Sequence, residues 1–221
     1  MSITETMRVR HSVRQYKKQP INAETISALQ MEIDVCNRES GLHIQLVTNE
    51  PKAFDSFMAH YGKFSGVINY IALIGKKESA LDEKCGYFGE RLVLKAQELG
   101  LNTCWVAMTY SKIKTAFTVR QGEKLCAVIA LGYGKNQGVP HKSKAISEVS
   151  KVEGEVPDWF KKGMEAALLA PTAMNQQKFL FTLDGSKVSA KPGKGFYTKL
   201  DLGIVKYHFV LGAGKENFEW A

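Results

Sequence analysis

The chain carries, near its start, the stretch Arg10-His11-Ser12-Val13-Arg14-Gln15-Tyr16, and 160 residues later the stretch Ala170-Pro171-Thr172-Ala173-Met174-Asn175-Gln176-Gln177. The first stretch is rich in guanidinium and hydroxyl groups, which donate hydrogen bonds to phosphate. The second is rich in amide groups, which both donate and accept, as the edge of a planar polar ring requires. Together they predict two halves of one binding site, brought together by a fold that joins distant parts of the chain.

Length and composition indicate an ordinary globular protein. The chain has 221 residues, of which 44% are hydrophobic and 24% charged, enough for one sizeable core or two small ones. No apolar run approaches the roughly 18 residues that cross a bilayer, and the polar residues 1–10 lack the apolar core of a secretory signal. We therefore expect a cytoplasmic protein without membrane partners.

The four cysteines predict neither a disulfide framework nor a metal site. They are Cys36, Cys85, Cys104 and Cys126, with no Cys-x-x-Cys pair and no His at ligand spacing. Cys104 and Cys126 lie in apolar runs, so they are interpreted as small buried hydrophobic residues.

The net charge of +8 raises the question of nucleic acid. However, the basic residues are spread along the chain and are densest at 8–18 and 141–144, with no Arg-rich helix or aromatic-basic stacking array. We expect no nucleic-acid partner. Two interpretations stay open for this charge: a solvated basic surface, or attraction of a phosphate-bearing cofactor.

Apolar periodicity, glycines and prolines predict an alternation of helices and strands. In the first half these are helix 22–38, strand 42–48, helix 51–60, strand 67–74, helix 86–99, strand 103–108, helix 112–119 and strand 125–132. In the second half they are helix 158–169, loop 171–176, strand 179–183, a turn at Asp184-Gly185, strand 187–190 and an amphipathic helix 199–211. The similar order of elements predicts two half-copies, 1–135 and 157–221, joined by a polar linker, 136–156.

Each of the two opening stretches also allows a purely structural interpretation. On a helical turn Arg10 and Arg14 would share one face with Ser12 between them, which suits either a phosphate site or an exposed basic helix. The loop 171–177 suits either the edge of a polar ring or local side-chain hydrogen bonds to its own backbone.

Several patches taken together resemble the FMN-dependent nitroreductase family. The first stretch, followed by Pro20-Ile21, is similar to the start of that family, and residues 170–177 are similar to its Ala-Pro-Ser-x-x-Asn-x-Gln loop. Further similar patches are the central helix and strand 86–105, the strand 128–134 and the basic segment 141–144. The resemblance implies an α+β fold with a mixed central sheet wrapped by helices.

Members of that family are usually intertwined homodimers with FMN at the dimer interface. In this chain the first half has the Arg-Ser-Arg segment but lacks the loop, and the second half has the loop but lacks that segment. The resemblance therefore implies a single chain that mimics the dimer and keeps one complete site, as in a smaller single-chain branch of the family. Further pairing of chains is left open.

By resemblance, FMN is bound by residues from both stretches. Arg10 and Ser12 would bind its phosphate with help from Lys142 and Lys144, His11 would add contacts, and Arg14 would lie at the pyrimidine edge. The residues implied to line the ring are Pro171, Thr172, Ala173, Asn175 and Gln177. No acid–base catalytic residue and no metal ligand are expected.

The implied activity is an NAD(P)H oxidoreductase that reduces nitroaromatic, quinone or related electron-poor acceptors by ping-pong hydride transfer through flavin N5. The alternatives are a flavin-binding sensor or carrier without turnover, and reductive dehalogenation. Two departures from the family pattern bear on this choice: Lys178 replaces a frequent Pro, and Val106-Ala107-Met108 lacks the usual Glu-Gly.

The remaining polar and aromatic residues carry weaker expectations. His208 is interpreted as structural, and His43 and His60 are assigned no role. Candidates for a substrate lid are Tyr61, Phe64, Tyr110 and Tyr197.

Overall fold

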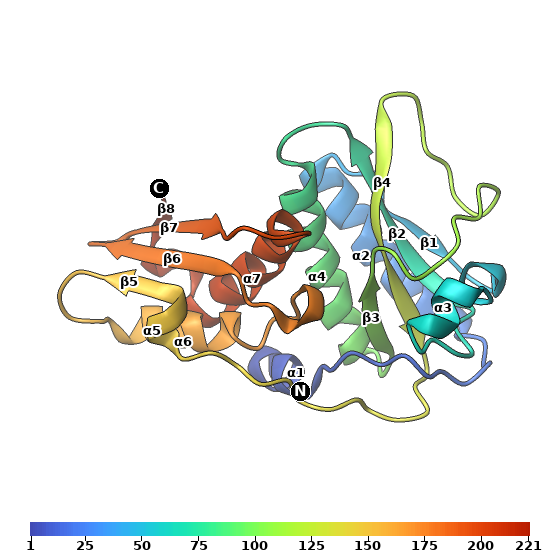
Figure 1. Ribbon diagram of the computed structural model, residues 1–221, viewed down its shortest axis with the longest axis horizontal. Coiled ribbons are helices and arrows are strands. Elements are labelled where there is room, and N and C mark those ends of the chain that lie inside the picture. The colour runs from blue at the N-terminus through green and yellow to red at the C-terminus, as the bar shows by residue number, and fades with distance from the viewer. The chain divides into compact units, whose positions relative to one another are not determined.

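The computed structural model describes all 221 residues and divides them into two compact units (Figure 1). Unit 1 comprises residues 1–9, 82–90 and 140–221, and unit 2 comprises residues 10–81 and 91–139. The chain therefore passes from one unit to the other several times. None of its helices combines the length and apolar character that a membrane-spanning helix needs.

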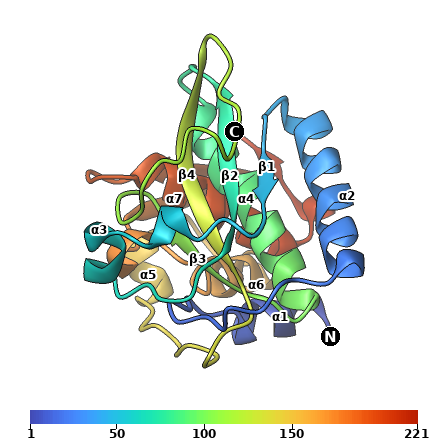
Figure 2. The ribbon, with the colours of Figure 1, turned by 90° about the vertical axis from the view of Figure 1, so that its right-hand side faces the viewer.

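Unit 2 is built on a four-stranded antiparallel sheet (Figure 2). Its strand order is β1 (Gln45–Val47), β2 (Asn69–Lys76), β4 (Glu123–Gly132) and β3 (Asn102–Val106). Seven consecutive residues of β2 are buried, so both faces of this central strand are covered. The apolar run predicted as a strand at 67–74 owes its unbroken character to this double burial.

Helix α2 (Ala23–Ser40) is determined by local signals at both ends. The side chain of Asn22 accepts a hydrogen bond from the Thr25 amide, and Gly41 ends the helix in the left-handed conformation at φ 70°. The helix buries Leu29 on its apolar side, as the sequence pattern predicts. The predicted helix 22–38 is thus confirmed and extends slightly further.

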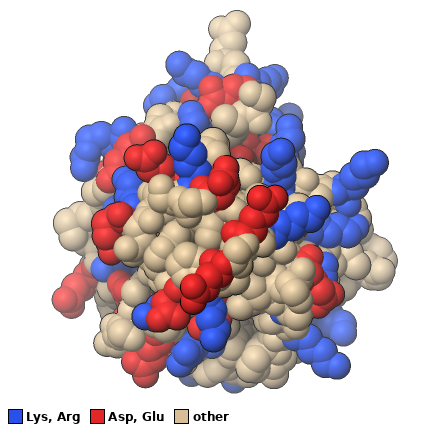
Figure 3. Space-filling model, turned by 90° about the vertical axis from the view of Figure 1, so that its left-hand side faces the viewer, with Lys and Arg blue, Asp and Glu red and all other residues tan.

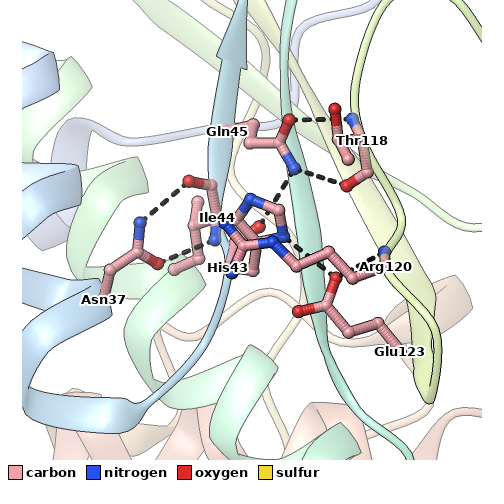
Figure 4. A network of polar contacts seen from close by, with 7 residues as sticks. All are labelled: Asn37, His43, Ile44, Gln45, Thr118, Arg120 and Glu123. Carbon is pink, nitrogen blue, oxygen red and sulfur yellow. Dashed lines mark hydrogen bonds and ion pairs between the residues drawn. The ribbon is translucent and has the colours of Figure 1, made fainter.

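The predicted helix 112–119 is wrong, because another side chain holds its backbone (Figure 4). The amide oxygen of Gln45 accepts from the Thr118 N–H at 2.9 Å, and its nitrogen donates to the Thr118 carbonyl at 2.8 Å. The backbone N–H of Ser111 is used as well, since it donates to the carbonyl of Ala53. With these groups bonded elsewhere, the segment follows an irregular path with one turn.

His43 belongs to the same polar network, and it has a partner that the sequence did not reveal (Figure 4). Its Nδ1 lies 2.9 Å from Oε2 of Glu123, which also accepts from the Arg120 N–H at 2.8 Å. Burial raises the pKa of Glu123, but the hydrogen bonds from His43 and Arg120 outweigh it and lower the pKa overall. The network fastens the start of β4 to the segment before β1.

Two short helices replace the single helix predicted at 51–60. They are η1 (Lys52–Phe54) and α3 (Phe57–Tyr61), and the side chain of Ser56 caps the second by accepting from the Ala59 amide. Asp55 interrupts the helical backbone between them, at φ −105° and ψ 57°.

Unit 1 has a mixed four-stranded sheet. Strand β5 (Ser150–Val152) is parallel to β6 (Phe179–Asp184), which is antiparallel to β7 (Lys187–Pro192), and β7 is parallel to β8 (Glu219–Trp220). The turn at Asp184-Gly185 is confirmed. The α+β class is confirmed too, but the one central sheet becomes two sheets, one in each unit.

The helices of unit 1 gather around α7 (Thr198–Ala213), which packs on α6 (Asp158–Ala167), on α1 (Ile3–Val9) and on the sheet. Ten of its residues are buried, so the amphipathic character predicted for 199–211 is wrong. A helix enclosed on all sides needs no polar face.

Two glycines allow a close approach between helices in unit 1. A β-carbon on Gly203 of α7 would lie 2.0 Å from the carbonyl oxygen of Glu83, and one on Gly86 would lie 2.0 Å from that of Leu200. Both Glu83 and Gly86 belong to α4 (Leu81–Glu98), whose residues 82–90 are part of unit 1. Only glycine allows the two backbones to approach this closely.

The compact units do not follow the continuous division into 1–135, 136–156 and 157–221. Residues 1–9 and 82–90 pack within the unit formed by 140–221. The predicted linker also contributes structure, because it contains α5 (Ile146–Val149) and the strand β5. That two halves of the chain are copies of one another remains a proposal.

Candidate functional site

The Arg10–Tyr16 stretch, in unit 2, is extended and not helical. Helix α1 ends at Val9, and Ser12 then forms a parallel bridge to Thr103 of β3, with the Val13 N–H donating to the Thr103 carbonyl at 3.0 Å. The prediction of a shared helical face is therefore wrong. Extended backbone nevertheless puts alternate residues on one side, so residues 10, 12 and 14 again share a direction.

Two glycines hold this extended stretch by close backbone contact. A β-carbon on Gly66, at φ 72°, would lie 2.2 Å from the carbonyl oxygen of Tyr16. One on Gly138, at φ 71°, would lie 2.7 Å from Cβ of His11 and 3.0 Å from the carbonyl oxygen of Ser12. Backbone bonds and close packing thus fix the path of the stretch.

Arg10, Ser12 and Arg14 all influence the thiol of Cys104. Burial raises the pKa of the Cys104 thiol, whereas Arg14, a hydrogen bond with Ser12, and Arg10 each lower it. Arg10 is buried, with 3% of its surface exposed, and Arg14 is exposed. The two guanidinium groups and the hydroxyl therefore form one cluster of donors, and one of its guanidinium groups faces solvent.

The loop 171–177, in unit 1, carries a concentration of strained backbone. It contains the short helix η2 (Ala173–Asn175), and three non-glycine residues are left-handed: Met174 at φ 51°, Asn175 at φ 53° and Gln177 at φ 44°. Each such residue costs about 1–2 kcal/mol, and strain of this kind clusters at functional sites.

The amides of Asn175 and Gln177 are occupied within unit 1. Nδ2 of Asn175 and Nε2 of Gln177 both donate to the carbonyl of Lys142, at 2.8 and 2.7 Å, and Gln177 Nε2 also donates to Asn175 Oδ1. Oε1 of Gln177 accepts from the Lys144 N–H at 2.9 Å, and Lys144 Nζ donates to the Gln177 carbonyl at 3.0 Å. These side chains join the loop to the basic segment 141–144.

The basic segment 141–144 is anchored at the end of α6 as well. Nε2 of His141 donates to the carbonyl of Leu168 at 2.9 Å, and Oγ of Ser143 donates to the same oxygen at 3.0 Å. The side chain of Lys142 is exposed. The segment and the loop are therefore one connected structure, with Lys142 on its outside.

Asp201 accepts two hydrogen bonds from the loop 171–177, a role that was not predicted from the sequence. It is 3% exposed on α7, its Oδ1 accepts from the Ala173 N–H at 2.9 Å, and its Oδ2 accepts from Nε2 of Gln176 at 2.8 Å. Burial raises the pKa of Asp201 to about 6, against the lowering effect of these two bonds. An acidic residue inside an apolar helical run was the available signal.

Four further residues of the loop are partly or largely exposed to solvent. Pro171, Thr172 and Ala173 are half-buried, and Met174 is 86% exposed at the tip. The Thr172 hydroxyl accepts from the Gln177 N–H at 3.1 Å.

His208 has the structural role that the sequence analysis expected. It is fully buried in unit 1, with Nε2 at 2.9 Å from Oε1 of Glu90 and Nδ1 donating to the carbonyl of Ala166 at 3.1 Å. Glu90 is also fully buried. His60 lies 3.5 Å from Asp55 with both side chains largely exposed.

The cysteines form neither a disulfide nor a metal site. None of the four cysteines forms a disulfide, and Cys126 is half-buried, where full burial was predicted. No group of three His, Cys, Asp or Glu side chains is arranged to hold a metal ion. On the face drawn in Figure 3, basic and acidic side chains are interspersed among neutral ones.

Comparison with solved structures identifies the fold. A "putative nitroreductase" from Thermotoga maritima MSB8 is 22% identical at a TM-score of 0.64, covering 98% of this chain and 85% of that one. A "putative NADH dehydrogenase/NAD(P)H nitroreductase" from Parabacteroides distasonis is 23% identical at 0.53, covering 66% and 95%. A nitroreductase family protein from Streptococcus pneumoniae is 12% identical at 0.54, covering 67% and 98%. The fold is that of the nitroreductases.

The family follows from the sequence match. Residues 2–213 match the family model described as "Putative TM nitroreductase", and the chain belongs to this family. It is therefore a nitroreductase-type oxidoreductase, and the resemblance inferred from the sequence is confirmed. No curated protein matches the chain.

Proposed function

We propose that the protein is a cytoplasmic, FMN-dependent NAD(P)H oxidoreductase that reduces nitroaromatic, quinone or related small electron-poor acceptors. The observation that carries the proposal is the cluster of Arg10, Ser12 and Arg14 on one side of a rigidly held extended stretch. Two guanidinium groups and a hydroxyl fit a phosphate and an adjacent polar ring, because each donates without needing a proton to move.

Within this cluster the residues take different parts. Arg10 and Ser12 bind the FMN phosphate, and Arg14, which is exposed, meets the pyrimidine edge of the ring. His11 contributes contacts from the same stretch. Lys142 and Lys144 add positive charge, Lys142 with an exposed side chain and Lys144 with one that also braces the loop.

In the loop 171–177 the roles divide in a way that the sequence did not suggest. Asn175 and Gln177 contribute to flavin binding indirectly, by fixing the loop, because their amides bond to backbone groups of Lys142 and Lys144. Pro171, Thr172 and Ala173 are left to line the ring. This division is supported by the left-handed backbone, which only a set of fixed contacts would maintain.

The redox chemistry belongs to the cofactor, and the chain supplies the binding site. Bound FMN would provide hydride acceptance and donation between NAD(P)H and the acceptor. The residues of the chain bind, orient and provide positive charge, and none is assigned as an acid–base catalyst. Reductive dehalogenation would need the same cofactor and differ only in the acceptor.

A second function, a flavin-binding sensor or carrier without turnover, is favoured by one observation. The residues after β3 are Val106-Ala107-Met108, in place of the Glu-Gly of the resembled family, and Met108 is 66% exposed. If this segment helps nicotinamide to dock in relatives, its replacement would leave binding intact and remove reduction.

The visible absorption spectrum of the purified protein, before and after anaerobic addition of NADPH or NADH, separates these functions. A yellow protein whose flavin bands bleach supports the reductase, and one that does not bleach supports the sensor or carrier. A colourless protein that cannot be reconstituted with FMN contradicts both. One flavin per chain in the monomeric protein would support the single-chain mimic of a dimer. Two flavins per chain, or none in the folded monomer, would contradict it.

A further inference from the structure

Unit 2 contains an open cavity of about 410 Å³ next to Arg14. The other side chains that define its character are Tyr61, Lys63, Trp105 and Thr109. Its volume falls within the roughly 300–1,000 Å³ of ordinary small-molecule sites. Phe64 also lines the cavity, so two of the four residues predicted as a substrate lid, Tyr61 and Phe64, lie here.

The charge of this cavity has a single sign. Arg14 and Lys63 are its ionised side chains, both exposed, and no Asp or Glu lines it. Two cations without a neighbouring carboxylate leave a positive field that an anionic group on a ligand would neutralise. The cavity therefore selects for a negative substituent.

Lys63 is held in place by its backbone. It follows α3 in the left-handed conformation, at φ 63°, and its N–H donates to the carbonyl of His60 at 2.8 Å. The preceding Gly62 packs so closely that a β-carbon there would lie 2.8 Å from Cβ and Oγ1 of Thr109. A non-glycine residue keeps such a conformation only when its surroundings fix it, so the lysine is positioned at the cavity.

Aromatic side chains supply the second part of the recognition. The ring of Tyr61 is at the end of α3 and is 76% exposed, and Trp105 of β3 is half-buried. Exposed aromatic surface at a cavity favours flat ligands, which stack on it and displace water.

We propose that this cavity binds the electron acceptor, and that the acceptor class is a planar aromatic carboxylate whose carboxylate pairs with Lys63. The inference rests on the proposed function, because Arg14 is there assigned to the flavin and Lys63 remains as the cation for the acceptor. Tyr61 and Trp105 contact the aromatic ring. Lys63 is thus a specificity-determining residue for acceptor charge.

The test compares two acceptors of similar size and shape, the anionic 4-nitrobenzoate and the neutral 4-nitrobenzamide. Their dissociation constants are measured by calorimetry on the FMN-loaded protein, and their KM values are measured with NAD(P)H. Wild-type protein binds the benzoate about two- to fivefold more tightly, as expected for a partly exposed ion pair. Lys63→Gln removes the preference, Lys63→Arg retains it, and Lys77→Gln, an exposed lysine away from the cavity, leaves it unchanged.

Two results would overturn the proposal: equal affinity for both acceptors in the wild type, or a preference that survives Lys63→Gln. Release of FMN by 4-nitrobenzoate would also overturn it, because the cavity would then belong to the flavin itself. Failure of the proposed function is a different result, namely a protein that takes up no FMN or whose FMN does not bleach with NAD(P)H.

Discussion

The extended stretch 10–16 and the loop 171–177 contain comparable numbers of polar side chains, yet their backbones are held by different groups. In the stretch, the Val13 N–H donates to the Thr103 carbonyl, and Gly138 lies in close contact with His11 and Ser12. In the loop, the amides of Asn175 and Gln177 themselves maintain a left-handed backbone. A ligand contact predicted from residue type is therefore more reliable where other groups fix the backbone than where the same side chains hold it.

The largest effect should come from Gly138→Ala, which disrupts the packing that holds the stretch in place. The new β-carbon meets His11 at 2.7 Å in a left-handed residue, so strain and overpacking together should lower the free energy of unfolding by about 2–5 kcal/mol. FMN affinity should fall with it. Urea unfolding and an FMN titration measure both.

Gly122→Ala is the matched control, since Gly122 has φ 80° and nothing within 4 Å of the added carbon. It should cost only the conformational part, about 1–2 kcal/mol. Equal losses for the two variants would mean that contact with the stretch is unimportant.

Asp201→Asn tests the loop through its pH dependence. The folded pKa of Asp201, about 6, exceeds the ordinary 3.8, so its stabilising contribution is full below about pH 4 and is lost as the pH rises through 6. The ionised carboxylate should thus cost the fold about 3 kcal/mol at neutral pH. Relative to the variant, the wild type should lose that much stability between about pH 4 and 7, as urea unfolding across this range would show.

The variant should nevertheless bind FMN more weakly at neutral pH, because an asparagine offers only one acceptor. Nε2 of Gln176 already donates to the Phe196 carbonyl as well, so the Gln176 amide cannot reverse without losing that bond. Parallel stability profiles against pH for the two proteins would contradict the raised pKa of Asp201.

Arg10→Ala tests whether the stretch presents its donors to a phosphate. A charge-assisted contact contributes about 1.5–3 kcal/mol, so the dissociation constant of FMN should rise roughly 10- to 150-fold. Arg10→Lys should recover part of the lost FMN affinity. Arg38→Ala, which removes an exposed arginine of α2, is the control and should leave FMN affinity unchanged. Riboflavin, which lacks the phosphate, should be insensitive to Arg10→Ala, and an equal loss for both flavins would argue against the assignment.

The smallest effect should come from Lys142→Gln, at the outside of the loop structure. An exposed charge is screened, so FMN affinity should fall by only about 0.2–1 kcal/mol at low salt, with no difference at high salt. Fluorescence titration at two ionic strengths measures it. A large, salt-independent loss would place Lys142 in direct, dehydrated contact with the phosphate.

Local signals were enough for much of the fold. Asn22 and Gly41 gave the limits of α2, and the apolar run gave β2. The conformation of residues 10–14 was beyond the sequence, because a spacing of four lies on one side of both a helix and an extended chain. Asp201 was missed because its partner, the Ala173 N–H, is 28 residues away and belongs to the backbone.

The contacts of His208 connect three helices inside unit 1. Nδ1 faces the carbonyl of Ala166 on α6, and Nε2 lies 2.9 Å from Oε1 of Glu90 on α4. Both side chains are fully buried, so solvent reaches this contact only when unit 1 opens. The pair is therefore an internal marker of how often the helices of unit 1 separate.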